Sequence, residues 1–196
     1  RLNQTGSKFG PFENQLFLGD YTLSVIMRAT TEQINGVWQG ACYPFREGLA
    51  TGIMHVEFSP KGQLIAGGFT TNRQWPVRGT EPFALQRLDW TGEVPFEIKE
   101  INIKKDGFLI HFTKPIDKRL AAVDGTYSIT TYTHNYAAGY GSPEVDHTTS
   151  KVTKASPSSD GISVRVYLKT IVEGHIHDFD LAPLTSNDGE KLLHSK

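Results

Sequence analysis

Three arginines stand in short polar segments whose composition is typical of exposed loops. Arg73 and Arg78 belong to TNRQWPVRG, residues 71–79, and Arg46 belongs to YPFREG. Loops carry binding residues more often than strands do, and a guanidinium group forms two parallel hydrogen bonds with a carboxylate. The sequence therefore predicts that these arginines bind carboxylate groups of a ligand. The alternative is that they pair with nearby acceptors, namely Glu81, Asp89 or backbone carbonyl oxygens.

Two tryptophans, Trp38 and Trp75, are candidates for contacting a flat ligand. An indole presents a large ring face on which such a ligand stacks. Indoles more often fill the core between β-strands, and that alternative applies to both residues. Trp75 lies between Arg73 and Arg78 and so belongs to the same predicted loop.

His175 and His177 form a His-x-His pair. On a β-strand, residues two positions apart point to the same face, which is a common geometry for two ligands of a metal ion. The same face carries Phe179 and Leu181, so a hydrogen-bonded structural histidine is the better interpretation of His177. No third ligand at a suitable spacing supports zinc, and we predict no metal site.

The segment 132–141, YTHNYAAGYG, combines three tyrosines with small residues. A tyrosine ring offers a large apolar area with a polar tip, which suits both carbohydrate binding and protein interfaces. Between these alternatives we favour docking on a neighbouring domain.

The composition excludes several classes of protein. The 196 residues are 38% hydrophobic and 21% charged, a balance typical of soluble globular domains. A net charge of −1 gives no attraction for nucleic acid, and no apolar run approaches the roughly 20 residues of a transmembrane helix. We therefore expect neither a nucleic-acid partner nor a membrane span. Cys42 is the only cysteine, so no disulfide forms within these residues, and we expect a buried, inert thiol.

One short pattern occurs twice, 48 positions apart. NQLFLGD begins at residue 14 and GQLIAGG begins at residue 62, each a turn, an apolar strand and a glycine. This spacing is close to the roughly 40–50 residues of a β-propeller blade, and a ring needs about four to eight blades. The pattern changes near Thr91, which leaves room for about two blades. We therefore predict that residues 1–92 form the last one or two blades of a larger propeller.

Glycine and proline recur along the chain, and no segment keeps a helical period, so the sequence predicts an all-β protein. Met54, Val56 and Phe58 alternate with polar residues and predict a strand with one buried face. After a turn at 60–62, a returning strand over 63–66 completes a hairpin. Residues 15–18 and 24–28 predict a similar pair.

The second half of the chain predicts a β-sandwich of immunoglobulin or fibronectin type over residues 93–196, because about six or seven strands fall in about a hundred residues. Alternating apolar residues in 162–168, and at Phe108, Ile110 and Phe112, predict strands with one buried face. The candidate strands cover 96–103, 107–113, 126–132, 151–155, 162–168 and 175–181.

Five segments resemble a known group of proteins: GPFENQLFLGD, GVWQGACYPFREGLATG, VEFSPKGQLIAGG, FALQRLDWTGEVPFEI and DGFLIHFTKPID. They are similar to the C-terminal part of secreted bacterial proteins of the glucose/sorbosone dehydrogenase-like class. These are six-bladed propellers often described as pyrroloquinoline quinone (PQQ)-dependent sugar dehydrogenases. Larger members continue into an Ig-like domain carrying YGSPEVD and an LLH motif, which stand here at 140–146 and 192–194. The resemblance covers nearly the whole chain.

The resemblance implies a parent protein that oxidises a sugar or other polyol by hydride transfer to bound PQQ, with calcium. Arg46, Arg73 and Arg78 would orient the cofactor, and Trp38 or Trp75 would stack on the sugar or the quinone. The family's catalytic base and most of its calcium ligands belong to earlier blades, so the catalytic residues are not assigned in this chain. Upstream blades or another chain would be its partner, in the periplasm or outside the cell. The alternative is a non-catalytic carbohydrate- or protein-binding module of a secreted multidomain protein.

Overall fold

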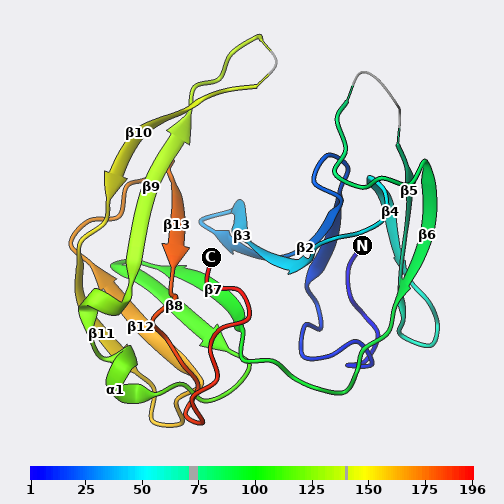
Figure 1. The fold of residues 1–196 in the computed structure, drawn as a ribbon. Coiled ribbons are helices and arrows are strands. Elements are labelled where there is room, and N and C mark those ends of the chain that lie inside the picture. The colour runs from blue at the N-terminus through cyan, green and yellow to red at the C-terminus, as the bar shows by residue number, and fades with distance from the viewer. Residues whose placement is uncertain (71–74, 140) are drawn as a thin grey trace. The chain divides into compact units, whose positions relative to one another are not determined.

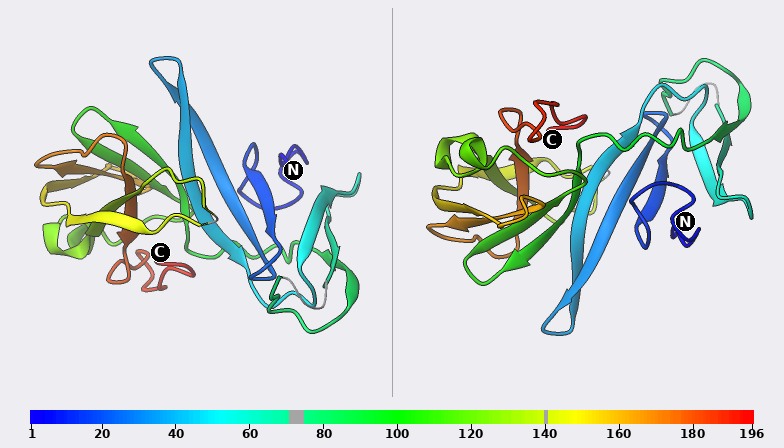
Figure 2. Two further views of the ribbon diagram at one scale, coloured as in Figure 1. Left: turned by 90° about the horizontal axis from the view of Figure 1, so that it is seen from above. Right: turned by 90° about the horizontal axis from the view of Figure 1, so that it is seen from below.

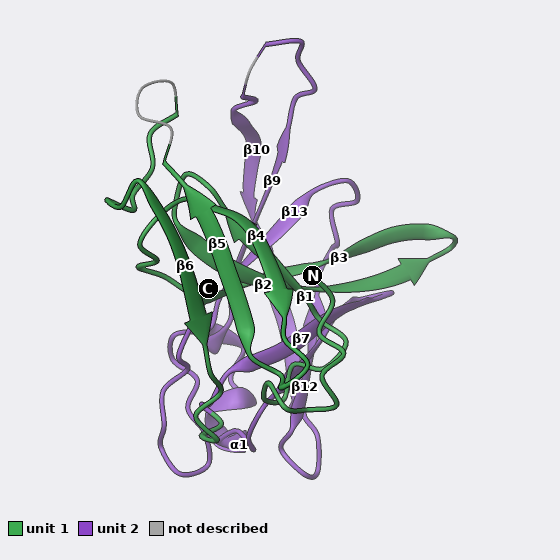
Figure 3. Ribbon diagram, turned by 90° about the vertical axis from the view of Figure 1, so that its right-hand side faces the viewer, with its two compact units in different colours: residues 1–94 green, residues 95–196 purple. Residues whose placement is uncertain are grey.

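The computed structural model describes residues 1–70, 75–139 and 141–196 (Figure 1). In these residues it contains thirteen β-strands, one short helix, α1 (Lys118–Ala121), and one 3-10 turn, η1 (Asp124–Thr126). The strands form four small antiparallel sheets, which confirms the predicted all-β class. The chain divides into two compact units, unit 1 (Arg1–Val94) and unit 2 (Pro95–Lys196) (Figure 3). Within the described ranges, no helix has the length and apolar character needed to cross a lipid bilayer.

The first sheet of unit 1 has the strand order β1-β2-β3. Its strands are β1 (Leu16–Asp20), β2 (Val25–Ile34) and β3 (Val37–Arg46). Asn35 and Gly36 join β2 to β3, and their φ angles are 50° and 83°. Two positive φ angles define the hairpin turn that Asn-Gly sequences prefer. The resulting long hairpin extends past the short β1 (Figure 2).

The second sheet of unit 1 has the order β4-β5-β6. Its strands are β4 (Ile53–Phe58), β5 (Leu64–Phe69) and β6 (Phe83–Leu88), and the predicted β4–β5 hairpin is confirmed. The prediction that Met54 lies on the buried face is wrong, because its side chain is 58% exposed. The pairing with β5 shifts register between Ile53 and His55, which inserts an extra residue. Ile53 and Val56 are therefore the buried residues of β4.

Side chains from both sheets of unit 1 meet in one aromatic core. The ring of Phe17 on β1 lies 5.3 Å from that of Phe58 on β4 and 4.9 Å from that of Phe45 on β3. Gly19 lets β1 approach β4 closely, since a Cβ atom there would lie 2.3 Å from Cγ2 of Ile53. The other aromatic rings of this core belong to Phe9, Phe12 and Trp90.

Arg28 on β2 is fully buried within unit 1. Its guanidinium carbon lies 4.3 Å from the ring centroids of both Phe12 and Tyr43, and its Nη1 donates a hydrogen bond to Oε1 of Gln15 (3.0 Å). Two ring faces and an amide oxygen thereby offset part of the cost of removing a charge from water. The sequence pattern does not predict this buried cation.

The prediction that Cys42 is buried is wrong, because the residue is exposed. Neighbouring Tyr43 points into the core, so alternation along β3 places Cys42 on the opposite face. Its Sγ atom lies 3.9 Å from Sδ of Met27. Partial burial of the sulfur atom raises the pKa of the Cys42 thiol.

Unit 2 contains two sheets, with strand orders β11-β12-β8-β7 and β10-β9-β13. Phe108 on β8 joins their side chains in one core, since its ring lies 5.0 Å from Phe179 and 5.1 Å from His177 on β13. The predicted buried faces of β8 and β12 are confirmed. The strands are β7 (Ile98–Lys104), β8 (Gly107–Phe112), β9 (Ser128–His134), β10 (Glu144–Thr149), β11 (Val152–Pro157), β12 (Ser163–Leu168) and β13 (Ile176–Asp180).

The C-terminal segment of unit 2 is held against the residues that precede β7. Glu97 is 3% exposed, and its Oε2 lies 2.6 Å from Nδ1 of His194. The backbone N–H of Leu193 donates to the carbonyl oxygen of Phe96 (3.0 Å). Two residues of the LLH segment therefore hold the end of the chain against the start of the unit.

Candidate functional site

Three connecting loops gather at one end of unit 1, because successive strands run in opposite directions. They join β1 to β2, β3 to β4 and β5 to β6. The N–H of Arg78 donates to the Thr22 carbonyl (2.9 Å), and the N–H of Glu81 donates to the Ala50 carbonyl (2.9 Å). These bonds tie the third loop to the first and the second. We call these loops, together with the adjoining Arg46, the loop cluster; in the described residues it comprises 21–24, 46–52, 70 and 75–82.

The structure brings two of the predicted arginines to this end of unit 1. Arg46 is the last residue of β3 and pairs with Ile26 at the start of β2. Arg78 is bonded through its backbone to Thr22, just before the same strand. Both are exposed, and neither guanidinium has an ion-pair partner in the part of the chain that the structure describes. Arg73, the third predicted arginine, lies outside the described residues.

The two predicted tryptophans lie at opposite ends of unit 1. Trp75 belongs to the loop cluster and is 47% exposed. Trp38 is 69% exposed and stands at the tip of the β2–β3 hairpin. Arg46 lies eight positions after Trp38 along the extended strand β3, which corresponds to about 26 Å. The structure therefore places Trp75, but not Trp38, in the same loop cluster as the two arginines.

Tyr21 in the loop cluster and Phe69 at the end of β5 form an aromatic pair that was not predicted from the sequence. Their ring centroids lie 6.5 Å apart. In the loop cluster, the hydroxyl groups of Thr51 and Thr70 lie 3.0 Å apart. The two aromatic residues are 48 positions apart, the offset of the repeated pattern, so the repeat itself carried the signal for this pair.

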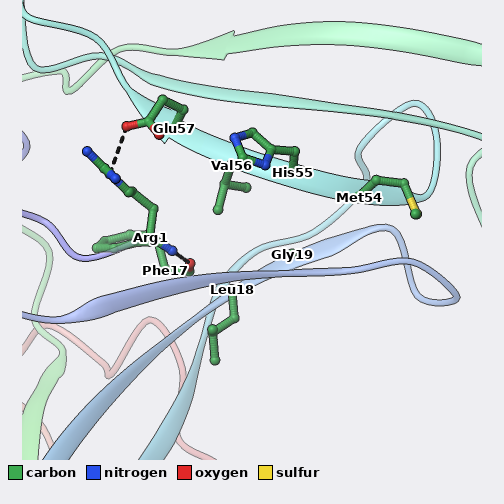
Figure 4. A pocket seen from close by; sticks show the side chains of 8 residues that line it. All are labelled: Arg1, Phe17, Leu18, Gly19, Met54, His55, Val56 and Glu57. Carbon is green, nitrogen blue, oxygen red and sulfur yellow. Dashed lines mark hydrogen bonds and ion pairs between the residues drawn. The ribbon is translucent and has the colours of Figure 1, made fainter.

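An open hollow of about 310 Å³ lies between β1 and β4 (Figure 4). Its wall carries the exposed apolar side chains of Leu18 and Met54 and the imidazole of His55. At one side Nε of Arg1 lies 2.7 Å from Oε1 of Glu57, and the two side chains point toward one another. Both charges are partly exposed, so this ion pair contributes little to stability. The hollow offers apolar contact but no cluster of unpaired charges.

In unit 2, the predicted His-x-His pair divides into two environments. His175 Nε2 lies 3.1 Å from Oδ2 of Asp146, in an ion pair when the imidazole is protonated. His177 packs on Phe108, and burial lowers its pKa, with the charge of His175 acting in the same direction. Nε2 of His177 is buried and has no hydrogen-bond partner among the described residues. In those residues no group of three His, Cys, Asp or Glu side chains is arranged to hold a metal ion.

A second set of aromatic side chains lies on the sheet β10-β9-β13. The rings of Tyr132 and His147 are stacked, with centroids 5.5 Å apart and planes 26° apart, and His134 meets Tyr132 edge-on at 5.6 Å. Partial burial, followed by the charges of Glu144 and Asp178, raises the pKa of the Tyr132 hydroxyl. We call Tyr132, His134 and His147 the aromatic face.

Of the two other tyrosines of the predicted segment, Tyr136 does not join these stacked rings. Tyr136 is fully exposed. Tyr140 lies outside the described residues.

Comparison with protein-family models, with curated proteins and with solved structures finds no match. The loop cluster offers two exposed cations beside an exposed indole, which suits an anionic ligand with a flat ring. The aromatic face offers stacked rings with polar edges, which suits a ligand with both apolar faces and hydroxyl groups.

Proposed function

We propose that unit 1 consists of two neighbouring blades of a β-propeller and unit 2 is an Ig-like sandwich, both from a secreted PQQ-type sugar or polyol dehydrogenase-like protein. The loop cluster carries this proposal, because it brings Arg46 and Arg78 to one end of the two sheets together with Trp75. The following three observations support its separate parts.

The way in which the two sheets of unit 1 pack, one face on the next, supports the propeller part of the proposal. Leu16–Gly19 and Leu64–Gly67 are equivalent in the repeat. Phe17 of the first sheet points toward the second sheet and is fully buried. Its equivalent, Ile65, points to the opposite side of the second sheet from Leu64 and Ala66, which face the core. The face of the first sheet that carries Phe17 is therefore covered by the second sheet, whereas the equivalent face of the second sheet, which carries Ile65, has no sheet packed on it in the described part of unit 1. A propeller, in which each blade packs on the next, would place a further sheet there.

One buried tyrosine supports the Ig-like part of the proposal. Tyr127 precedes β9, and its hydroxyl donates a hydrogen bond to the carbonyl oxygen of Ala121, six residues earlier (2.7 Å). Burial, followed by the charge of Asp124, raises the pKa of Tyr127, so the hydroxyl keeps its proton. A tyrosine that bonds back to the backbone a few residues upstream is a hallmark of Ig-like sandwiches.

The chemistry of the loop cluster suits the quinone that the proposal requires. PQQ carries carboxylate groups around a flat ring system, and a guanidinium group matches a carboxylate with two hydrogen bonds. Arg46 and Arg78 would hold these carboxylates, and Trp75 would contact the ring. The bound quinone would accept the hydride from the sugar or polyol. A catalytic base and the calcium ligands would come from other blades of the parent protein.

Binding of PQQ tests this proposal directly, because Trp75, one of the three tryptophans of the chain, lies in the loop cluster and its fluorescence reports on a ligand there. We expect saturable quenching in the chain of 196 residues and weaker binding in Arg78→Ala, by about 1.5–3 kcal/mol, the range for a hydrogen bond to a charged group. Arg87→Ala is the matched control, since Arg87 is an exposed arginine of β6 outside the loop cluster. Equal affinity in the two variants, or an unchanged spectrum at saturating PQQ, would overturn the proposal.

A non-catalytic carbohydrate-binding role is the second candidate, and the aromatic face favours it. Sugar rings stack on aromatic side chains, and the edges of His134 and His147 offer hydrogen bonds to hydroxyl groups. A glycan array would identify a ligand, and Tyr132→Ala should abolish its binding. Tyr167→Ala is the control, because Tyr167 lies on the other sheet of unit 2. Retained glycan binding in Tyr132→Ala would exclude the aromatic face.

A further inference from the structure

The sheet β4-β5-β6 ends in β6, and no strand in the described residues pairs with the outer edge of β6. One bond fixes the hydrogen-bonding pattern of this edge, since the N–H of Thr70 donates to the carbonyl oxygen of Pro82 (2.8 Å). Bonded and non-bonded residue pairs alternate along an antiparallel ladder. Phe83, Leu85 and Arg87 therefore direct their N–H and C=O groups away from β5.

The outer edge of β6 carries exposed apolar side chains at two positions, Phe83 and Leu85, and not the charged residues or prolines that protect most free edges. Phe83 and Leu85 are 77% and 79% exposed, and Phe69, which pairs with Phe83, is exposed beside them. Soluble proteins usually protect a free edge with charged residues, with proline or by covering it. Here the one charged side chain on β6 is Arg87, which pairs with Asp89 (2.8 Å). The backbone groups of Phe83 and Leu85 thus lie beside an open apolar surface.

The first repeat shows what occupies the same position in the equivalent sheet. β1 and β5 are equivalent in the 48-residue repeat, and each pairs with the strand that follows it, β2 or β6. The edge of β2 that faces away from β1 pairs along its whole length with β3. β3 is antiparallel to β2 and places Tyr43 in the core. The second repeat has no such strand in the part of the chain that the structure describes.

We propose that the outer edge of β6 binds an extended segment of a partner polypeptide as an added antiparallel strand, with aromatic or aliphatic side chains at alternate positions. Backbone hydrogen bonds to Phe83, Leu85 and Arg87 supply affinity in this mode of recognition. Alternate side chains of the added strand cover Phe83 and Leu85, as β3 covers its side of the first sheet. The inference rests on the repeat and on the edge of β6, and it holds whether or not the loop cluster binds a quinone.

A peptide with the sequence of β3, with its cysteine replaced by serine and a fluorescent label attached, is the probe. We expect saturable binding, measured by fluorescence anisotropy, and slower hydrogen exchange of the backbone amides of Phe83, Leu85 and Arg87 in the complex. Leu85→Pro removes one outward N–H group, and an edge strand tolerates proline at such a position. It should bind at least about tenfold more weakly than Leu85→Ala, which loses the same side chain but keeps the N–H group.

N-methylated peptides test the proposal without altering the protein. Methylation of alternate residues blocks one edge of the peptide, and methylation of the intervening residues blocks the other. Strand addition predicts that one set loses binding and the other keeps it. Equal binding of both sets, or no binding at about 1 mM peptide, a concentration that corresponds to about −4 kcal/mol, overturns the proposal. A concentration-dependent dimer that Leu85→Pro abolishes would assign the edge to a second copy of the chain and would also overturn it.

Discussion

The two sheets of unit 1 carry the same pattern of apolar residues but differ in what covers them. In the first sheet, Phe17 is fully buried because side chains of the second sheet pack on it. In the second sheet, the equivalent face carries Phe69, Phe83 and Leu85, and all three are exposed. A sequence pattern therefore specifies which face of a strand is apolar, whereas a neighbouring sheet decides whether that face is buried.

This difference explains why the exposed face is not a defect of local folding. The strands β4, β5 and β6 are fully paired with one another, and their other face contributes Leu64 and Ala66 to the core. A large apolar face beside an unpaired edge is a feature of interaction surfaces in soluble proteins. The covered and uncovered faces should therefore respond differently to the same substitution.

Phe17→Ala and Phe83→Ala test that difference with the largest expected effect. Phe17→Ala removes a fully buried ring and should lower the free energy of unfolding by about 3–5 kcal/mol. Phe83→Ala removes an exposed ring and should change it by no more than about 0.5 kcal/mol. Urea unfolding followed by tryptophan fluorescence measures both. A cost for Phe83→Ala as large as that for Phe17→Ala would mean that the face is covered by another molecule in solution.

Gly19 and Gly67 occupy equivalent positions in the repeat and provide a second matched pair. A Cβ atom at Gly19 would lie 2.3 Å from Ile53 in the covered interface, so Gly19→Ala should destabilise unit 1 by about 1–3 kcal/mol. A Cβ atom at Gly67 would lie 3.2 Å from Cδ1 of Leu85, the end of an exposed side chain that can move. Gly67→Ala should therefore be neutral, or stabilising by about 0.5–1 kcal/mol, since alanine loses less backbone entropy than glycine. Equal destabilisation in thermal melts of both variants would contradict the difference between the two faces.

Much of the fold could be predicted from the sequence because alternation and turns are local signals. The hairpins β1–β2 and β4–β5 of unit 1 and the buried faces of β8 and β12 follow from them. The hairpin β2–β3 was not predicted, although Asn35-Gly36 is a strong signal for it. The register shift at Ile53 and the burial of Arg28 could not be predicted, because each depends on side chains of other strands.

The candidate site was partly predictable for the same reason. Loop composition identified Arg46, Arg78 and Trp75 one by one, but their common end of unit 1 follows from the directions of six strands. Trp38 is a residue type that often contacts ligands. Its position at the tip of the β2–β3 hairpin depends on β3, a strand that was not predicted. Residue type suggests chemistry, and topology decides which residues act together.

Partly buried His177 and exposed His55 provide a third comparison between a covered and an uncovered position. It predicts a smaller effect, on how the free energy of unfolding depends on pH. His177 lies against Phe108 in the covered core of unit 2, and burial lowers its pKa below the ordinary value of 6.5. In the unfolded chain the imidazole regains its ordinary pKa, so between the two pKa values the unfolded chain binds more protons. The contribution of His177 to the stability of unit 2 is therefore fully present above about pH 6.5 and falls as the pH drops through this value toward the folded pKa.

His177→Phe should reduce this loss of stability on acidification, since phenylalanine keeps the ring contact with Phe108 but does not titrate. His55→Phe is the control for replacing an exposed imidazole, because His55 lies on β4 of unit 1, outside the core of unit 2. Urea unfolding between pH 7.5 and 5 measures both profiles, and NMR titration of the imidazole protons measures the pKa of His177 directly. A folded pKa of His177 at or above its ordinary value would show that coverage by the opposite sheet does not control its protonation.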